Sequence, residues 1–250
     1  MPKNSSPSNS KIFPKLNLND PSYTPILMVL LLVASFLLGA LTTKLSYTQQ
    51  GNVPSASSAP TNQQAQAQPG KKVNVDLGHL PLQGSKDAKV SVVEFADFQC
   101  PFCEKWFKDV KPSILSDYVN KGLVKFTFRH YAFLGQESTW ASEAAECANE
   151  QGRFWDYHDY LYNHQGQENS GAFSKANLEK FASDLGLNTQ QFNSCLDSDK
   201  YAKAVSDDTT AGQNAGVTGT PSIFVNGQLI VGAQPYSAFK TVIDQALSGK

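Results

Sequence analysis

The sequence has no excess of charge of either sign, since 21 lysine and arginine residues face 22 aspartate and glutamate residues over 250 positions. A nucleic-acid-binding domain normally carries a basic patch or stripe, so this balance argues against that class of protein. Cysteine is also scarce. Four residues are too few for a small scaffold held by many disulfides, and methionine occurs only twice. A chain of this length can bury a core without covalent cross-links, and it allows one or two domains.

Charge is absent altogether from residues 21–43, where most side chains are apolar. As a helix rising 1.5 Å per residue, about 20 such residues cross a hydrocarbon core of roughly 30 Å. We therefore expect a transmembrane anchor at residues 21–45. The alternative is a cleaved signal peptide, which needs a shorter apolar core followed by an A-x-A-like cleavage site. The following residues, TTKLSYTQQ, offer no such site.

The segments on either side of the apolar run predict its orientation. Residues 1–20 contain several lysines and one acidic residue, and the positive-inside rule places such a tail in the cytoplasm. Residues 46–71 are rich in Gln, Ser, Ala, Asn and Pro and have little to bury, which predicts a flexible linker. Residues 72–250 have the composition of a globular domain, which either an anchor or a signal peptide would export.

The first part of this domain has the pattern strand, helix, strand. Residues 89–96 (KVSVVEFA) are mostly β-branched or apolar and predict a strand. The loop DFQCPFC leads into a segment with apolar residues at helical spacing, which the dipeptide Lys111-Pro112 should kink or break. Residues 123–133 alternate between apolar and polar side chains and predict a second strand. Together these elements indicate a βαβ unit, which joins two parallel strands.

The rest of the domain is expected to be helical in its middle and to return to strands near its end. Five helices are expected: at residues 138–151, at 152–163, after Ser174, after Asn188, and at 198–214. Residues 222–225 and 228–231 flank Asn-Gly, which predicts a β-hairpin. An amphipathic helix is expected at 236–247. We therefore expect an α/β domain with a helical insertion at about residues 136–216.

Two cysteines, Cys100 and Cys103, lie at the expected strand-to-helix junction in the motif Cys-Pro-Phe-Cys. Two intervening residues bring the sulfurs within bonding distance when the second cysteine is already helical. The first cysteine then lies at the helix N-terminus, where unpaired backbone N–H groups and the helix dipole favour an anion. Because a thiolate is the attacking species in disulfide exchange, we expect Cys100 to be the nucleophile and Cys103 the buried resolving thiol. Pro101 suits the first helical turn, where a missing N–H matters least.

Spacing alone leaves two other uses of this motif open. The pair could form a structural disulfide, or it could supply half of a zinc site. Such a site needs two more ligands, and Cys147 and Cys195 occur singly, without the paired spacing typical of structural zinc. His130, His158 and His164 are not at ligand spacing either. We interpret these histidines as core or surface residues and expect no metal site.

Several segments together carry a resemblance to a known family. The segment FADFQCPFC and the later segment GVTGTPSIFVNG resemble the thioredoxin superfamily, and the helical segment CANEQGRFWDYHDYLY resembles its bacterial DsbA-like branch. The resemblance covers essentially all of residues 71–250. It implies a thioredoxin fold with an inserted all-helical domain, here preceded by one N-terminal transmembrane helix.

The resemblance also implies roles for individual residues. Cys100 matches the nucleophile of the family and Cys103 its resolving cysteine. Thr220-Pro221 matches the cis-proline loop, which offers backbone groups to an extended substrate. Glu94 matches a buried acidic residue that relays the proton of the resolving thiol. A carboxyl on a buried strand should have a raised pKa, which agrees with that role; a solvated strand residue is the alternative.

Phe102 departs from the family pattern. Strong oxidants of the family often carry a histidine between the two cysteines, where it stabilises the thiolate, and phenylalanine can donate no such hydrogen bond. Thiolate stabilisation favours the reduced enzyme and hence its oxidising power. We therefore predict a weaker oxidant than the histidine-bearing members. Pro101 and Phe102 are expected to contact the substrate beside Thr220 and Pro221.

The other two cysteines, Cys147 and Cys195, both fall on expected helices of the insertion. They could form a second catalytic pair, but neither lies in a CxxC motif or at a helix N-terminus. The favoured interpretation is a structural disulfide between two helices, and similar cysteines occur as a structural disulfide in some DsbA-like proteins. Asp97 and Phe98 are expected to shape the rim of the active site.

Together these features predict a membrane-anchored, extracytoplasmic thiol–disulfide oxidoreductase that introduces disulfides into exported proteins and needs no metal or organic cofactor. Its expected partners are exported proteins with reduced cysteines and a quinone-linked membrane re-oxidase resembling the DsbB or VKOR type. A reductase or isomerase of the same fold is the first alternative. The second is a thioredoxin-like metallochaperone that binds Cu(I) through Cys100 and Cys103, although two methionines are few for such a protein.

Overall fold

The computed structural model describes residues 72–249. The cytoplasmic tail (1–20), the anchor (21–45) and the linker (46–71) expected from the sequence lie outside the described residues. Within residues 72–249, no helix has the length and apolar character needed to cross a membrane.

A four-stranded sheet forms the centre of the domain, with the strand order β2-β1-β3-β4. Strands β1 (Val90–Ala96) and β2 (Val124–His130) are parallel, as the βαβ pattern predicts. Strand β3 (Ser222–Val225) is antiparallel to β1 and forms the predicted hairpin with β4 (Gln228–Val231). Nearly every residue of β1, β2 and β3 is buried, because helices cover the sheet.

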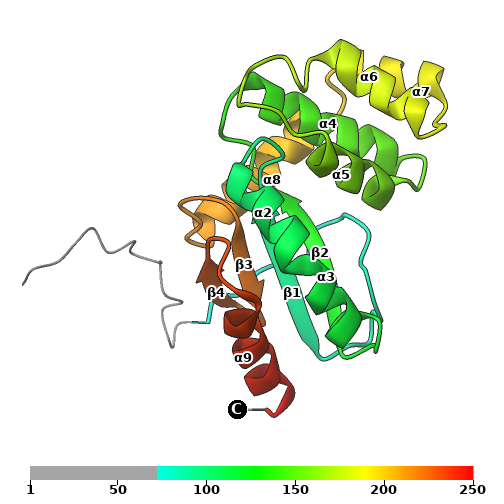
Figure 1. Cartoon of the computed structure of the whole chain (residues 1–250). Helices are drawn as coiled ribbons and strands as arrows, with labels where there is room; N and C mark the ends of the chain where they lie inside the picture. Colours follow the sequence, from blue (N-terminus) through cyan, green and yellow to red (C-terminus); the bar gives the residue numbers. More distant parts are fainter. Residues whose placement is uncertain (1–71, 250) are drawn as a thin grey trace, which may run out of the picture. The chain divides into compact units, whose positions relative to one another are not determined.

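Helices connect the strands and form a separate group beyond one end of the sheet (Figure 1). The connection from β1 to β2 contains α2 (Pro101–Asp109), α3 (Lys111–Ile114) and the π-helical turn η1 (Leu115–Val119). The remaining helices are α4 (Gln136–Asn149), α5 (Phe154–Asn163), α6 (Lys175–Asp184), α7 (Thr189–Asp197), α8 (Ala202–Asn214) and α9 (Tyr236–Leu247). Helices α4 to α8 lie between β2 and β3 in the chain, which confirms the helical insertion.

Local sequence explains several of the helix ends. The helix after the CPFC motif breaks before Lys111-Pro112, as expected, and α3 starts there. Asn188 caps α7, because its side chain accepts a hydrogen bond from the backbone of the first turn. Ser174 also occupies an N-cap position, before α6, but its side chain makes no capping hydrogen bond. The expected helix at 198–214 begins later, at Ala202, because the chain turns first.

The insertion packs directly on the part of the core that holds the two motif cysteines. One buried cluster contains the two motif cysteines, Cys100 and Cys103, and Phe128 of strand β2. The same cluster includes apolar residues of α4 and α5, among them Ala144 and Tyr157. A second cluster fills the space between the sheet and the helices α2 and α9. The environment of the cysteines is therefore built jointly by the sheet domain and the insertion.

Candidate active site

The two cysteines of the CPFC motif lie between β1 and α2. Cys100 is the N-cap residue of α2, with extended backbone angles (φ −73°, ψ 119°), and Pro101 follows in the first turn. The Cys100 carbonyl accepts hydrogen bonds from the backbone N–H groups of Cys103 (3.0 Å) and Glu104 (3.1 Å). Both thiols are free. Cys100 retains 5% of its surface, and Cys103 is fully buried.

The two thiols differ strongly in acidity. The pKa of Cys100 is lowered from 9.0 to about 6, and the largest cause is a hydrogen bond from the Cys103 side chain. The Thr220 side chain and the backbone N–H groups of Cys103 and Phe102 lower the pKa further, and together these contacts outweigh burial, which raises it. Burial and the contact with Cys100 raise the pKa of Cys103 well above 9.0. At neutral pH Cys100 is therefore mostly a thiolate and Cys103 a thiol, which suits attack by the first and resolution by the second.

The cis-proline loop lies against the nucleophile. The Thr220-Pro221 peptide bond is cis. The Cys100 sulfur lies 3.4 Å from the carbonyl oxygen of Thr220, to which it donates a hydrogen bond when it is protonated. Pro101 is exposed, and Phe102 has 63% of its surface exposed. The structure thus brings together all the residues that the sequence predicts for nucleophile, resolving thiol and substrate contact.

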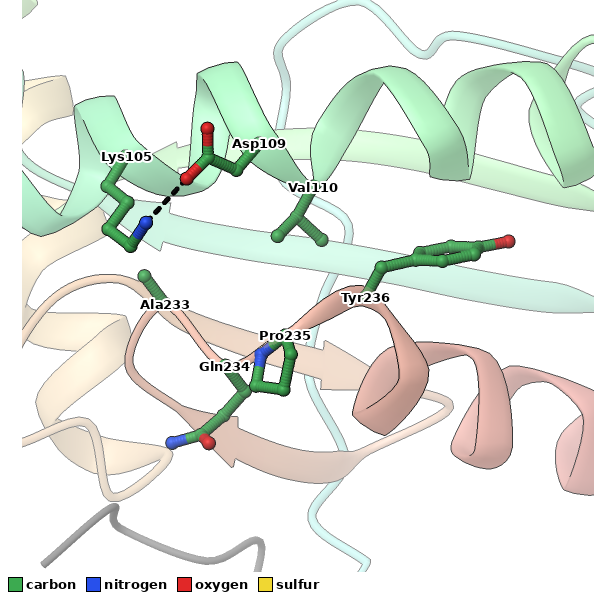
Figure 2. Close-up of a pocket in the computed structure, with 7 residues that line it drawn as sticks. All are labelled: Lys105, Asp109, Val110, Ala233, Gln234, Pro235 and Tyr236. Atoms are coloured by element: carbon green, nitrogen blue, oxygen red, sulfur yellow. Dashed lines mark hydrogen bonds and ion pairs between the residues drawn. The ribbon is translucent and has the colours of Figure 1, made fainter.

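An open hollow of about 410 Å³ lies between α2 and the loop after β4. On the side of α2, Lys105 and Asp109 form an ion pair with 2.5 Å between Nζ and Oδ2 (Figure 2). The loop on the other side is joined to the cis-proline residue, because the N–H of Gly232 donates a hydrogen bond to the carbonyl of Pro221 (2.8 Å). The hollow is lined by Lys105, Asp109, Val110, Ala233, Gln234, Pro235 and Tyr236.

Glu94 is a buried acid on β1. Only 1% of its surface is exposed, and neither carboxyl oxygen has a hydrogen-bond partner among residues 72–249. Burial raises its pKa from 4.5 to about 8, opposed by the charge of Lys111 and reinforced by Cys100. Glu94 also raises the pKa of Cys103 through its charge. Glu94 is therefore not a solvated strand residue, and its acidity suits proton exchange near neutral pH.

Lys111 is a member of this site that the sequence does not reveal. In the sequence it marks only the helix break before Pro112, and a single lysine beside a proline carries no signal for burial. In the structure 2% of its surface is exposed, and its Nζ lies 3.2 Å from Oδ1 of Asp159 on α5. Burial lowers the pKa of Lys111, opposed by the charges of Asp159 and Glu94.

The insertion also holds the loop that precedes Cys100. Asp97 accepts a hydrogen bond from the hydroxyl of Ser138 on α4 (2.7 Å). Nε2 of Gln165, after α5, donates hydrogen bonds to the carbonyls of Phe98 (2.6 Å) and Cys100 (3.1 Å). Because Asp97 and Phe98 are fully buried, the expectation that they form the rim of the site is wrong: they support the loop from inside. No sequence pattern marks Gln165, because its partners are backbone groups far away in the chain.

The remaining two cysteines form a disulfide that joins α4 to α7. The Cα atoms of Cys147 and Cys195 are 5.9 Å apart, and 48 positions separate them in the chain. His130 and His158 are fully buried, whereas His164 is exposed. Among the residues that the structure describes, no group of three His, Cys, Asp or Glu side chains is arranged to hold a metal ion.

The fold and the site together define a class of protein. The defining parts of a thiol–disulfide oxidoreductase are all present. They are a CPFC motif at a helix N-terminus, one thiol with a lowered pKa and one buried thiol, and a cis-proline loop on a thioredoxin-type sheet.

Comparisons with known proteins agree with this class. A family model described as Thioredoxin matches residues 77–245. Disulfide bond formation protein D of Bacillus subtilis is 32% identical over 173 residues, which is 68% of this chain and 78% of that protein. The chain therefore belongs to the thioredoxin family and is a DsbA-like thiol–disulfide oxidoreductase.

Two solved structures show the same architecture. The crystal structure of oxidised BdbD from Bacillus subtilis has a TM-score of 0.64 and 31% identity, and the match covers 68% of this chain and 94% of that chain. The crystal structure of α-DsbA1 from Wolbachia pipientis has a TM-score of 0.63 and 21% identity, covering 70% of this chain and 94% of that chain. At 21% identity the second likeness concerns the fold alone.

Proposed function

We propose that this oxidoreductase works as an oxidase that introduces disulfides into exported proteins. The observation that carries the proposal is the difference in acidity between the two thiols, with the pKa of Cys100 lowered to about 6 and that of Cys103 raised. Stabilising the Cys100 thiolate favours the reduced form of the pair, and an enzyme that is stable when reduced is a good oxidant of other thiols. The name of the Bacillus subtilis relative, disulfide bond formation protein D, supports the same direction.

The reaction moves two electrons from a substrate dithiol to the Cys100–Cys103 disulfide. A substrate thiolate attacks the Cys100 sulfur, the bond to Cys103 breaks, and Cys103 leaves as a thiolate that takes a proton from Glu94. A second substrate thiolate then attacks the substrate sulfur of this mixed disulfide. The oxidised substrate is released, and Cys100 leaves as a thiolate that the first turn of α2 stabilises.

Re-oxidation runs through the same groups. The Cys100 thiolate attacks a disulfide of the re-oxidase, Cys103 gives its proton to Glu94, and the Cys103 thiolate attacks the Cys100 sulfur and displaces the partner's thiolate. We assign this re-oxidation to a quinone-linked membrane protein of the DsbB or VKOR type. No metal or organic cofactor takes part in either half of the cycle.

The substrate is an extended segment that passes Cys100 between Phe102 and the Thr220-Pro221 loop. Phe102 and Pro101 are exposed beside the nucleophile, so they are available to apolar groups of an unfolded chain. The hollow beside α2 lies next to the loop that is bonded to Pro221, and it offers further contact area to the same segment.

The proposed location is the outer side of the cell membrane. The uncharged run at residues 21–43 and the lysines before it support a single-pass anchor at 21–45 with residues 1–20 in the cytoplasm. The linker 46–71 then separates the anchor from the catalytic domain. An oxidising compartment also suits the disulfide between Cys147 and Cys195.

The redox state of the motif in living cells tests the direction of the reaction. Cells that produce the full chain are quenched with acid, free thiols are alkylated, and the state of Cys100 and Cys103 is measured by mass spectrometry. We expect the pair to be mostly disulfide, with Cys100→Ser as the variant that cannot form it. A mostly dithiol pair would instead assign a reductase or isomerase. Copper bound in equal amount to the purified chain, without oxidation of reduced ribonuclease, would assign the metallochaperone.

A further inference from the structure

The segment that carries the cis-proline, residues 215–221, joins α8 to β3 without regular secondary structure. The carbonyl oxygen of Thr220 in this segment lies 3.4 Å from the Cys100 sulfur. The position of the segment therefore decides how an extended substrate can lie over the nucleophile. Because no helix or strand fixes its backbone, that position depends on the few hydrogen bonds that reach the segment from other elements.

One of these hydrogen bonds comes from Tyr131, the residue directly after β2. Its hydroxyl donates a hydrogen bond to the carbonyl of Val217 at 3.0 Å. Its backbone N–H donates a hydrogen bond to the carbonyl of Ala96 at 2.9 Å, and Ala96 is the last residue of β1, the strand that leads to Cys100. Tyr131 thus connects the strand of the nucleophile directly to the cis-proline segment.

The ring of Tyr131 is held firmly by its surroundings. Only 6% of the residue is exposed, and it packs in one buried cluster with Phe95 and Val217. On the side of α8, a Cβ atom at Gly212 would lie 2.7 Å from Cδ2 of Tyr131, so glycine leaves the ring its space. The ring has little freedom to move, and its hydroxyl therefore sets a fixed distance between β1 and the segment.

A second hydrogen bond comes from Ser222, the first residue of β3. Its hydroxyl donates a hydrogen bond to the carbonyl of Gly219 at 2.7 Å. Ser222 also pairs with Phe95 in the β1–β3 register, so this contact ties the segment to β1 as well. A third hydrogen bond, from the N–H of Gly232 to the carbonyl of Pro221, is a backbone contact that does not depend on a side chain.

The outer side of the segment stays open to a substrate. Thr218 is exposed, and Gly219 and Thr220 are half-buried. The two hydroxyl groups belong to the buried residues Tyr131 and Ser222, so they hold the segment from its inner side. Backbone groups of the segment are therefore fixed in place and still accessible to an extended chain.

We propose that Tyr131 and Ser222 are positioning residues, which hold the cis-proline segment where an extended polypeptide can bind beside Cys100. This inference rests on the proposed function, in which the substrate passes Cys100 along Thr220 and Pro221. A segment that is already in place needs no ordering when the substrate arrives, so the polypeptide binds more tightly. A small dithiol that reacts at Cys100 without lying along the segment gains nothing from this order.

A purely structural role for the two hydroxyl groups makes a different prediction. Loss of a buried hydrogen bond lowers the stability of the fold, but the molecules that remain folded would then bind substrate as before. A change in the reactivity of the Cys100 sulfur would slow large and small substrates alike. Only a displaced segment weakens the binding of a polypeptide and spares a small dithiol, so a comparison of two such substrates separates the three cases.

The experiment measures the oxidation of two substrates in single turnovers. The purified full-length chain, kept in detergent with Cys100 and Cys103 joined in a disulfide, is mixed with an excess of substrate. One substrate is an unstructured peptide with two reduced cysteines, and the other is dithiothreitol. Samples are quenched in acid, and mass spectrometry follows the loss of the enzyme disulfide over time at a series of substrate concentrations.

The variants remove hydroxyl groups and little else. Tyr131→Phe keeps the ring that packs on α8, Ser222→Ala keeps a small side chain at the start of β3, and a double variant combines them. The matched control is Tyr157→Phe, which removes another buried tyrosine hydroxyl that donates a hydrogen bond to a backbone carbonyl, that of Leu178 in the insertion (2.8 Å). Circular dichroism checks that each protein is folded at the assay temperature.

We expect the peptide concentration that gives half of the maximal rate to rise about fivefold in Tyr131→Phe and in Ser222→Ala, since one hydrogen bond typically shifts an equilibrium by about that factor. The double variant should show a larger rise than either single variant. The maximal rate with the peptide and the rate with dithiothreitol should stay within about twofold of wild type, as a loss of binding alone predicts. Tyr157→Phe should match wild type with both substrates.

The positioning role would be overturned if both single variants reached half of the maximal rate at the same peptide concentration as Tyr157→Phe. Equal slowing with the peptide and with dithiothreitol would also overturn it, and so would a wild-type rate that rises with peptide concentration without saturating. If one variant does not fold, the other decides, because its hydroxyl comes from a different element. A wild-type disulfide that neither substrate reduces would refute the proposed function itself, and the positioning role with it.

Discussion

The disulfide between α4 and α7 should contribute a large share of the stability of the insertion. Cys147 and Cys195 are 48 positions apart, and in the chain-entropy model a cross-link over a loop of that length destabilises the unfolded state by about 4 kcal/mol at 25 °C. For a domain of this size, 1 kcal/mol shifts the melting temperature by about 2–4 °C. We therefore expect the double variant Cys147→Ser/Cys195→Ser to melt about 8–16 °C below the wild type.

The assay has two readouts. Thermal unfolding is followed by circular dichroism without reductant, and thiol oxidation is measured with reduced ribonuclease at a temperature where both proteins are folded. The double variant Cys147→Ala/Cys195→Ala serves as a control, because both sites are buried and serine adds the cost of burying two hydroxyl groups. We expect full oxidase activity in both variants. A melting temperature within about 2 °C of wild type would refute the entropic argument. Lost oxidation at unchanged stability would make this pair catalytic.

Three further predictions concern the active site. Because the pKa of Glu94 is raised in the folded state, its carboxyl stays protonated there between pH 4.5 and about 8, and the stability of the protein falls as the pH rises through that window. The variant Glu94→Gln should therefore melt at a higher temperature than wild type, and the difference in melting temperature should widen from pH 5 to pH 8. Phe102→His should lower the pKa of Cys100 below about 6 and shift the equilibrium with glutathione towards the reduced enzyme, and an unchanged equilibrium would contradict the role given to this position. Gln165→Ala removes the side-chain amide that donates a hydrogen bond to the Cys100 carbonyl. The pH at which Cys100 is half-maximally reactive in alkylation should therefore rise in this variant. Gln167→Ala, on the same loop, should leave that pH unchanged.

The parts of the fold that were predictable from sequence depend on neighbouring residues. The hairpin of β3 and β4 follows from Asn226-Gly227, whose two residues both adopt positive φ. The amphipathic period of residues 236–247 gave the bounds of α9. The strand before the CPFC motif and the helix after it likewise place Cys100 at a helix N-terminus.

The parts that were missed depend on contacts between distant segments. Lys111 is buried because α5 and the sheet close over it, and its ion partner Asp159 lies in the insertion. The sequence predicts Asp97 at the rim of the active site. In the structure its carboxylate is buried, because it accepts hydrogen bonds from the hydroxyl of Ser138 and from the backbone N–H of Phe133 after β2. No periodicity in the sequence records such pairings, because charged residues are usually exposed and a local pattern says nothing about what covers them.

The sequence by itself determined which residues can carry the chemistry: a CPFC motif at a strand-to-helix junction, an acid on the preceding strand, and a Thr-Pro dipeptide before the last hairpin. Each is local, so short-range rules of backbone geometry and helix capping suffice to find it. Only the tertiary structure decided how those residues behave. Burial made Glu94 a weak acid and Cys103 a weaker one, contacts with the first turn of α2 and with Thr220 made Cys100 a stronger one, and the insertion gave the buried site its neighbours Lys111 and Asp159. Acidity depends on the surrounding dielectric and on nearby charges, and both exist only once distant segments have packed together.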